Sequence, residues 1–269
     1  MTLLIHSMSE LSEIILSALD TAGATNVVEI GAEFGGMSQL LADFTAERGG
    51  TLTSIDPCVK PEFTAWLSQN PSVRHVAQPS LDAIPSQGGV DAWIVDGDHN
   101  YYTVYHELHG IDAACRRDGK PLLAFLHDVN WPCARRDSYY VPERIPAEWR
   151  HPYDYDGGAT LDSEDLVPGQ GFRGEGQFAF ATHSGGPRNG VLTAVEDFID
   201  EAGRAGADLS FAFVPAVFGL GILFDSGAPW SPQLAQAVIP FHRSPLLQSM
   251  EDNRLRNYLR VLELQDASF

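Results

Sequence analysis

Four acidic residues stand in or directly after short apolar runs of this sequence. They are Glu29, Asp56, Asp96 and Asp128. Carboxylates at such positions can accept hydrogen bonds from hydroxyl groups, neutralise a cationic ligand or hold a divalent metal ion. If the runs are parallel strands of one sheet, their carboxyl ends share an edge, and open α/β sheets bind ligands at that edge. We therefore expect these carboxylates to converge on one site.

A glycine-rich turn follows the first of these runs. Gly31, Gly35 and Gly36 lie between an apolar run and a segment of helical periodicity. Glycine lets the backbone curl tightly and lets a ligand approach without a Cβ in the way. Two residues after Gly31 stands Glu33, where the dinucleotide-binding fingerprint has glycine, and its carboxylate would repel a pyrophosphate. The turn therefore favours a ligand that carries no phosphate.

Two histidines adjoin the later acidic strand ends. His99 follows Asp96 and Asp98, and His127 precedes Asp128. An imidazole titrates near neutral pH, so His127, His99 or both can accept a proton from a reacting hydroxyl. The three aspartates are candidate ligands of a divalent metal ion, and Asp128 is also a candidate catalytic residue. The competing interpretation is that the acids cap the helices that follow and the histidines are structural.

Strand and helix patterns alternate around these residues. Such alternation predicts a parallel, doubly wound α/β sheet. A helix-then-strand unit is expected over residues 61–76. The other expected strands cover residues 27–30, 51–55, 91–95 and 121–126, and the other expected helices cover residues 8–22, 37–44 and 102–115.

The alternation stops after the strand that precedes His127. Residues 132–189 are rich in Gly, Pro, Tyr, Arg and Asp and show little periodicity. A long irregular stretch within a compact domain is usually a lid or a binding loop, so we expect an insertion over the site. Its polar aromatic and basic residues suit a flat polar small molecule, although they would also serve simply to pack the insertion. The candidate substrate-binding residues are Trp131, Arg135, Arg136, Tyr139 and Tyr140.

Regular structure is expected again in the last part of the chain. A helix over residues 191–202 precedes apolar runs at 209–214 and 219–224, which predict an antiparallel pair at the sheet edge. The expected fold class is thus α/β, with a Rossmann-like sheet of six parallel strands and one antiparallel strand. We expect residues 1–269 to form a single domain. A final helix over 246–265 can pack on its own domain or on a second subunit, so a homodimer is compatible with the sequence.

Composition limits the class of protein. With 44% hydrophobic residues among 269, the chain can bury a full core, and its formal net charge of −19 would repel a nucleic-acid backbone. No stretch is apolar for the roughly 18 residues of a membrane span, and residues 1–7 lack the basic start of a secretion signal. Three cysteines at unrelated spacings suit reduced thiols. We expect a cytoplasmic protein that binds a small-molecule substrate, without nucleic-acid or membrane partners.

The pattern Glu29-x-Gly31-x-x-x-Gly35, with Asp56 ending the next strand, resembles the fingerprint of class I S-adenosylmethionine-dependent methyltransferases. The resemblance covers residues 8–130, and residues 190–224 by topology alone. It implies that Asp56 holds the ribose, that Ser80 lies near the adenine, and that Glu29 supports the turn or the cofactor's amino group. The cofactor-binding residues so implied are Glu29, Gly31, Gly35, Gly36, Asp56, Ser80 and Asp96.

The reaction side resembles the metal-dependent O-methyltransferases of the catechol and antibiotic-sugar types, and the cephalosporin-hydroxylase-like branch. In these proteins acids after the fourth and fifth strands hold Mg²⁺, as Asp96 and Asp128 would here, although Val129 follows where the family has a second acid or an amide. The implied reaction is methyl transfer to a hydroxyl of a secondary metabolite such as a sugar or a phenol. The alternatives are a metal-independent N-methyltransferase, a hydroxylase-like relative, a nicotinamide-binding domain and a non-catalytic binding protein.

Overall fold

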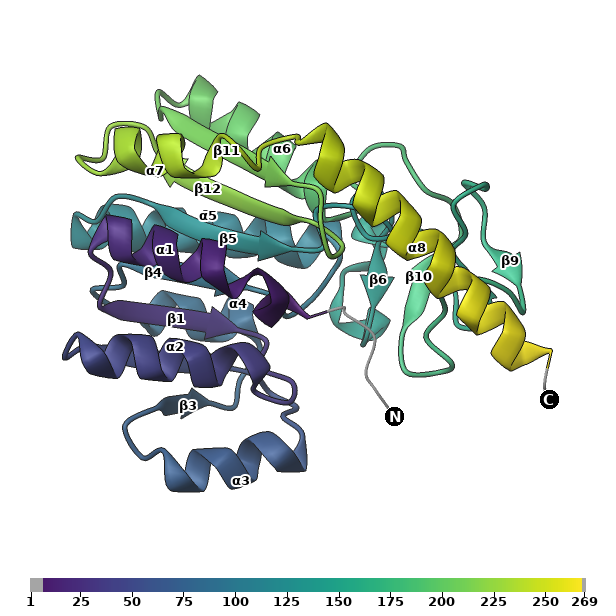
Figure 1. The fold of residues 1–269 in the computed structure, drawn as a ribbon, viewed down its shortest axis with the longest axis horizontal. Helices are drawn as coiled ribbons and strands as arrows, with labels where there is room; N and C mark the ends of the chain where they lie inside the picture. The colour runs from purple at the N-terminus through teal and green to yellow at the C-terminus, as the bar shows by residue number, and fades with distance from the viewer. Residues whose placement is uncertain (1–6, 268–269) are drawn as a thin grey trace.

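The computed structural model describes residues 7–267 and has a seven-stranded sheet at its centre, with helices on both faces (Figure 1). The strand order is β11-β12-β5-β4-β1-β2-β3. The strands are β1 (Asn26–Ile30), β2 (Thr51–Ile55), β3 (Arg74–Val76), β4 (Ala92–Val95), β5 (Leu123–His127), β11 (Leu209–Val214) and β12 (Leu220–Asp225). Of these, β12 alone runs antiparallel to its neighbours β5 and β11. The predicted α/β fold class is therefore confirmed.

The helices cover the sheet in two layers, each with its own hydrophobic core cluster. One layer holds α1 (Ser12–Ala22), which follows the short helix η1 (Met8–Leu11), with α2 (Gly36–Glu47) and α7 (Ser231–Val238). The other holds α4 (Ser80–Ala83), η2 (Ile84–Ser86), α5 (Tyr101–Asp118) and α6 (Val191–Arg204). Helix α3 (Pro61–Gln69) lies beside the β3 edge of the sheet (Figure 1). The helix-then-strand unit at 61–76 is confirmed, whereas α7 was not expected, because eight residues show too little periodicity.

Apolar spacing explains why α6 packs as it does. Val191, Ala194, Val195 and Phe198 recur at helical spacing and are all buried, so one stripe of the helix faces the sheet. Burying each large apolar side chain stabilises the fold by about 1.5–3 kcal/mol. The helix thereby fixes the point at which the insertion rejoins the sheet.

The segment between β5 and α6 contains more regular structure than its sequence suggests. Two small antiparallel sheets form there, one of β6, β10 and β7 and one of β8 and β9. Asp137 holds them to the core, because its buried carboxylate accepts hydrogen bonds from the backbone N–H groups of Tyr101 and Gly190 and from the Tyr139 hydroxyl. Its elements are β6 (Ser138–Tyr139), η3 (Pro142–Arg144), η4 (Ala147–Trp149), β7 (Tyr153–Asp154), β8 (Gly157–Gly158), β9 (Val167–Pro168) and β10 (Ala179–Ala181).

The last helix, α8 (Pro245–Asp266), extends beside the insertion (Figure 1). Asp266 pairs with Arg173, and the ring of Tyr258 contacts that of Phe172. The helix therefore packs on its own chain, and a homodimer stays a prediction. None of the described helices is both long and apolar enough to cross a membrane. Residues 1–6, where the absence of a secretion signal was expected, lie outside the described part.

Candidate functional site

The glycine turn after β1 is shaped by close contacts within the chain. Gly31 has a φ of 88°, and a Cβ there would lie 2.2 Å from the carbonyl oxygen of Asp96. Gly35, with a φ of 85°, precedes α2, and a Cβ there would lie 2.6 Å from the Phe63 ring. Gly36 opens α2 and has more room, since the nearest atom to its added Cβ is 3.6 Å away. Two of the three glycines are thus required by the chain's own packing.

Asp56, at the end of β2, ties this turn in place. One carboxylate oxygen accepts hydrogen bonds from the backbone N–H groups of Ala32 and Glu33, at 2.9 and 3.1 Å. The other accepts one from the N–H of Cys58 at 2.7 Å. The first oxygen thus uses both of its lone pairs, and the second keeps one lone pair for a further hydroxyl group.

Glu29 supports the turn from beneath. Its buried carboxylate accepts hydrogen bonds from the Ser38 hydroxyl of α2 at 2.5 Å and the Ser54 hydroxyl of β2 at 2.8 Å. Burial raises the pKa of Glu29 to about 7, against the lowering effect of the two serines. The residue therefore joins three elements beneath the turn, which corresponds to the first of its two expected roles.

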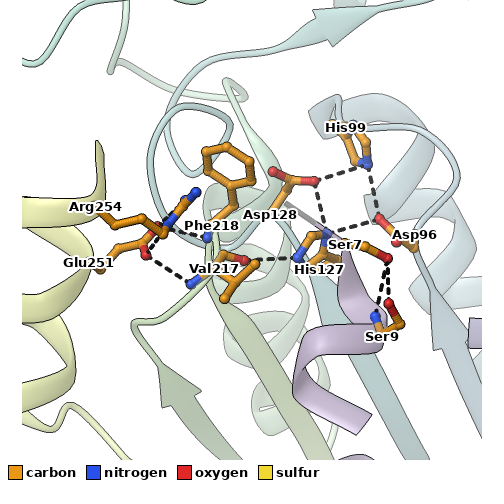
Figure 2. A network of polar contacts seen from close by, with 10 residues as sticks. All are labelled: Ser7, Ser9, Asp96, His99, His127, Asp128, Val217, Phe218, Glu251 and Arg254. Carbon is orange, nitrogen blue, oxygen red and sulfur yellow. Dashed lines mark hydrogen bonds and ion pairs between the residues drawn. The ribbon is translucent and has the colours of Figure 1, made fainter. Parts of the chain in front are cut away.

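Four side chains meet at the carboxyl ends of β4 and β5, and we call them the His-Asp quartet: Asp96, His99, His127 and Asp128 (Figure 2). The Nε2 atom of His99 lies 3.3 Å from Asp96 Oδ1 and 3.2 Å from Asp128 Oδ2. The Nδ1 atom of His127 lies 3.1 and 3.3 Å from the same two oxygens. Imidazole nitrogens and carboxylate oxygens thus alternate around a closed ring, which is the convergence expected of strand-end residues.

Opposite charges hold the quartet together. Burial alone would lower the pKa of His99, but the carboxylates of Asp128 and Asp96 outweigh it and raise that pKa to about 9. Burial would also lower the pKa of His127, but the same two carboxylates outweigh it, so the pKa of His127 is raised. Conversely, the two imidazoles outweigh burial and lower the pKa values of Asp96 and Asp128. The two carboxylates therefore favour the protonated form of both imidazoles, and a role of His99 or His127 as proton acceptor stays a prediction.

A second layer of contacts orients His127. Its Nε2–H donates to the backbone carbonyl of Val217 at 2.9 Å, so Nδ1 faces the carboxylates. The turn that carries Val217 and Phe218 has positive φ values of 49° and 60°. Glu251 of α8 accepts hydrogen bonds from both backbone N–H groups of this turn, and Arg254 pairs with Glu251 (Figure 2). No local sequence signal identified Val217 or Glu251 as parts of the site.

Two other expected site residues, Asp98 and Ser80, are not members of the quartet. Asp98 accepts a hydrogen bond from the Thr103 hydroxyl of α5 at 3.2 Å, and the three described residues whose ligand atoms lie within 4.8 Å of one another are Asp96, His99 and Asp128. Ser80 is the first residue of α4 and lies close to the buried Glu107. The structure thus brings Asp96 and Asp128 together with the histidines, whereas Asp98, an expected metal ligand, is bonded to Thr103 of α5 and is not among the three clustered ligands.

The expected substrate-binding residues divide into two groups. Tyr140 is 46% exposed, and its ring centroid lies 6.0 Å from that of His99, so it lies at the quartet. Trp131 is half-buried and contacts Phe218, although its indole N–H donates to the Thr160 carbonyl. Tyr140 therefore lies at the quartet and Trp131 at the Phe218 turn, and their role in substrate binding stays a prediction.

The remaining three candidates hold the insertion together. Arg135 forms two hydrogen bonds with Glu196 of α6, at 2.6 and 2.8 Å. Arg136 is buried and donates to backbone carbonyls, and Tyr139 is fully buried against Asp137. In this structure the arginine pair therefore serves packing, and neither guanidinium is directed at the quartet.

A buried carboxyl near the site gives a testable pH dependence. Burial, with the charge of Asp98 adding to it, raises the pKa of Glu107 to about 8, against the lowering effect of the nearby Ser80 hydroxyl. The folded state therefore holds a proton that the unfolded state releases above its pKa of about 4.3. The free energy of unfolding should fall as pH rises from there to about 8, by up to about 1.4 kcal/mol per pH unit.

In Glu107→Gln this contribution should be lost, and stability relative to the wild type should rise between about pH 5 and about pH 8. Urea unfolding at several pH values measures the difference. Glu148→Gln, which changes an exposed carboxyl of the insertion, is the matched control and should follow the wild type. Parallel curves for Glu107→Gln and the wild type would show that Glu107 is ionised in the folded protein.

The part of the chain that carries the site is also the part that matches known proteins. Residues 28–129 match a family model described as a methyltransferase domain. This segment contains the glycine turn and all four residues of the quartet, and the match confirms the methyltransferase resemblance there. No curated protein sequence matches the chain.

Solved structures with a similar fold include several methyltransferases. The mitomycin 7-O-methyltransferase MmcR is 21% identical over 45% of this chain and 36% of its own, with a TM-score of 0.36. The SAH-bound methyltransferase PaMTH1 of Podospora anserina is 12% identical, over 80% and 76% of the two chains, with a TM-score of 0.46. TomG of Streptomyces achromogenes, an O-methyltransferase in complex with SAM, is 15% identical over 82% of each, with a TM-score of 0.46. At such low similarity these proteins say nothing about the acceptor of this chain.

Proposed function

We propose that this chain transfers the methyl group of S-adenosylmethionine to a hydroxyl group of a small molecule. The observation that supports this most strongly is the convergence of Asp96, His99 and Asp128 beside the glycine turn, with ligand atoms within 4.8 Å of one another. A domain that only binds a ligand has no need of such an arrangement beside its binding turn. The chemistry is an in-line displacement, in which the sulfur–methyl bond breaks as the bond between methyl and the acceptor oxygen forms, and the hydroxyl proton would leave to His99 or to water.

The residues around the turn fit this cofactor. S-adenosylmethionine carries a sulfonium and an ammonium cation but no phosphate, and Asp56 and Asp96 lie beside the glycine turn, with the buried Glu29 beneath it. These acids suit a cationic ligand and would repel a pyrophosphate. Asp56 would hold the ribose hydroxyls, Asp96 would lie toward the sulfonium, and Ser80 would lie on the adenine side. Gly31, Gly35 and Gly36 would give the cofactor a wall of backbone.

The quartet would act on the acceptor. Asp96 and Asp128 offer oxygens and His99 offers a nitrogen, all within 4.8 Å of one another, so these three residues would hold a divalent cation. Bound there, such a cation lowers the pKa of a hydroxyl group and orients it. Because His127 is buried with both ring nitrogens engaged, its role is to hold Asp96 and Asp128 in position; His99 lies nearer the surface beside Tyr140. Tyr140 suits a flat or sugar-like acceptor, such as a secondary metabolite.

An N-methyltransferase or a hydroxylase-like relative would use the same cofactor turn. Neither needs the quartet, because an amine attacks without a bound cation to acidify it. Hydroxyl methylation therefore accounts for more of the observed residues. A non-catalytic binding protein accounts for fewer still.

Cofactor binding by the Asp56→Ala variant tests the first half of this proposal. Asp56 shapes the turn and faces the proposed ribose position, so its loss should weaken S-adenosylmethionine binding by at least about tenfold. Isothermal calorimetry with S-adenosylmethionine, S-adenosylhomocysteine and NAD measures it. Asp162→Asn, an exposed change in the insertion, is the control and should bind as the wild type does. A wild-type protein that takes up NAD but neither sulfur compound would contradict the proposal.

A further inference from the structure

Helix α8 presents apolar side chains on two faces, one buried and one exposed. The inner face is buried through Glu251, Leu255 and Leu259. The outer face carries four large apolar side chains that are 39–70% exposed, together with two exposed asparagines. At about 100° per residue, these six positions lie along one line on the side of the helix opposite Leu255. We call this line the outer stripe: Leu246, Met250, Asn253, Asn257, Val261 and Leu264.

An exposed line of this kind points to a contact with another helix. Four of the eight large apolar side chains that are exposed among residues 7–267 lie on the outer stripe. Isolated exposed apolar residues are common on protein surfaces, whereas a contiguous row usually marks an interaction site. Steps of three or four residues, as along the stripe, are the spacing of the seam between paired helices. A helix that faced only solvent would have no need of such a seam.

The outer stripe has the same order of residue types from either end. In an antiparallel pair of α8 helices the facing residues would be, in turn, Leu246 and Leu264 of the partner subunit, Met250 and Val261 of the partner subunit, and Asn253 and Asn257 of the partner subunit. All three pairs are centred at or next to Leu255, so a single register satisfies them. An interface of two-fold symmetry requires one patch that is complementary to itself, and the stripe meets this requirement.

The two asparagines at the centre of the stripe would fix this register. Within one copy, the side-chain amide of Asn257 donates to the backbone carbonyl and to the side-chain oxygen of Asn253, at 2.9 and 2.5 Å. In helix pairs a polar asparagine on the seam selects the register and the number of helices, at a cost in stability. A shift by one turn would place these amides against apolar side chains, so the centred register is favoured.

The charge of α8 permits two copies to approach each other. The formal net charge of the whole chain is −19, which opposes association through most of its surface. Helix α8 carries three arginines against four acidic residues, so its own formal charge is only −1. A contact along its 22 residues would extend over about 33 Å. Repulsion between two copies is therefore small along this helix.

We propose that the outer stripe of α8 is the surface through which two copies of this chain associate, with their α8 helices antiparallel. The sequence left open whether the last helix packs on its own domain or on a second subunit. The structure assigns the inner face of α8 to its own chain, and the proposal assigns the outer face to the second copy. It concerns association alone and does not rest on the methyltransferase function. A helix of a different protein is the competing occupant, and it would require no symmetry in the stripe.

Sedimentation equilibrium of the full-length protein tests the surface. We expect the wild type to be a dimer and Met250→Glu to raise the dissociation constant at least about 100-fold. The new carboxylate would lie against Val261 of the partner subunit without a counterion, and symmetry repeats this cost. Because Met250 is 60% exposed, the variant should fold, which circular dichroism checks.

Ile239→Glu is the matched control, since Ile239 is 65% exposed and follows α7, outside the stripe. This variant should dimerise as the wild type does. A wild-type protein that stays monomeric at about 100 µM would overturn the proposal, and the stripe would then await a different protein. A dimer that Ile239→Glu dissociates and Met250→Glu leaves intact would place the interface at α7 and overturn it as well.

Disulfide cross-linking tests the antiparallel register. In a Cys58→Ser background, which removes the exposed thiol, the double variant Met250→Cys/Val261→Cys should form disulfides between subunits on mild oxidation. Met250→Cys alone should not, because an antiparallel pair separates its two copies by about 16 Å along the helices, beyond the reach of a disulfide. Efficient cross-linking of Met250→Cys alone would indicate parallel helices and overturn the register.

Discussion

Asp128→Asn is expected to lower the rate of methyl transfer by about 1000-fold or more while changing the affinity for S-adenosylmethionine by less than about threefold. The substitution removes the negative charge that stabilises both imidazoles, since Asp128 Oδ2 lies 3.2 Å from His99 Nε2 and 3.3 Å from His127 Nδ1. It also removes one oxygen donor for a divalent cation. The cofactor turn contacts Asp56 instead, so cofactor binding should persist.

Asparagine is the substitution of choice because of the backbone at this position. Asp128 has a φ of 59°, in the left-handed region that asparagine tolerates and that alanine does not. Formation of S-adenosylhomocysteine with a panel of phenols and sugars measures the rate, on whichever acceptor the wild type methylates. Asp162→Asn, the same change at an exposed site, should retain full activity. An equal loss of cofactor affinity in Asp128→Asn would assign Asp128 to the cofactor half of the site.

The convergence of the quartet could be predicted because it follows from topology. Asp96 ends β4 and Asp128 follows β5, and these neighbouring parallel strands pair along their length. Parallel neighbours bring their carboxyl ends to one edge, so residues that are distant in sequence meet there. The histidines lie within three residues of the aspartates and were therefore placed with them.

What the sequence could not reveal depends on contacts between distant segments. The side chain of Glu251 reaches the Val217 turn from a helix that begins after it, and no spacing rule links the two. The same holds for Arg135, whose pairing with Glu196 left it engaged in packing rather than free to clamp a substrate. The strands β6 to β9 have two residues each, too few to show an alternating pattern. Long-range polar contacts and very short strands thus account for most of the unforeseen structure.

At Gly31, the reason for glycine that the sequence suggests differs from the one that the structure shows. The sequence pattern implies that Gly31 lacks a Cβ so that a ligand can approach the turn. In the structure the nearer constraint is the backbone of the neighbouring strand end, the carbonyl of Asp96. One residue thereby couples the cofactor turn to the first member of the quartet, because Gly31 can approach only as closely as Asp96 permits.

Gly31→Ala should consequently destabilise the protein far more than a glycine-to-alanine change at an ordinary turn. A left-handed φ of 88° costs alanine about 1–2 kcal/mol, and overpacking against the Asp96 carbonyl 2.2 Å away adds about 1–3 kcal/mol. The matched control is Gly49→Ala, with a φ of 66° and no atom within 4 Å of the added Cβ, which should show the backbone cost alone.

Urea unfolding of both variants measures their free energies of unfolding. The difference between the two losses is the cost of the contact between the new methyl group and the Asp96 carbonyl. A Gly31→Ala variant that folds should also lose methyl transfer, because Asp96 must move to admit the new methyl group and the quartet then opens. Equal destabilisation of the two variants would mean that the backbone at Asp96 moves away from the new methyl group without a cost in free energy. In that case the coupling between the cofactor turn and the quartet would not be a property of this fold, since Asp96 could shift without cost to stability.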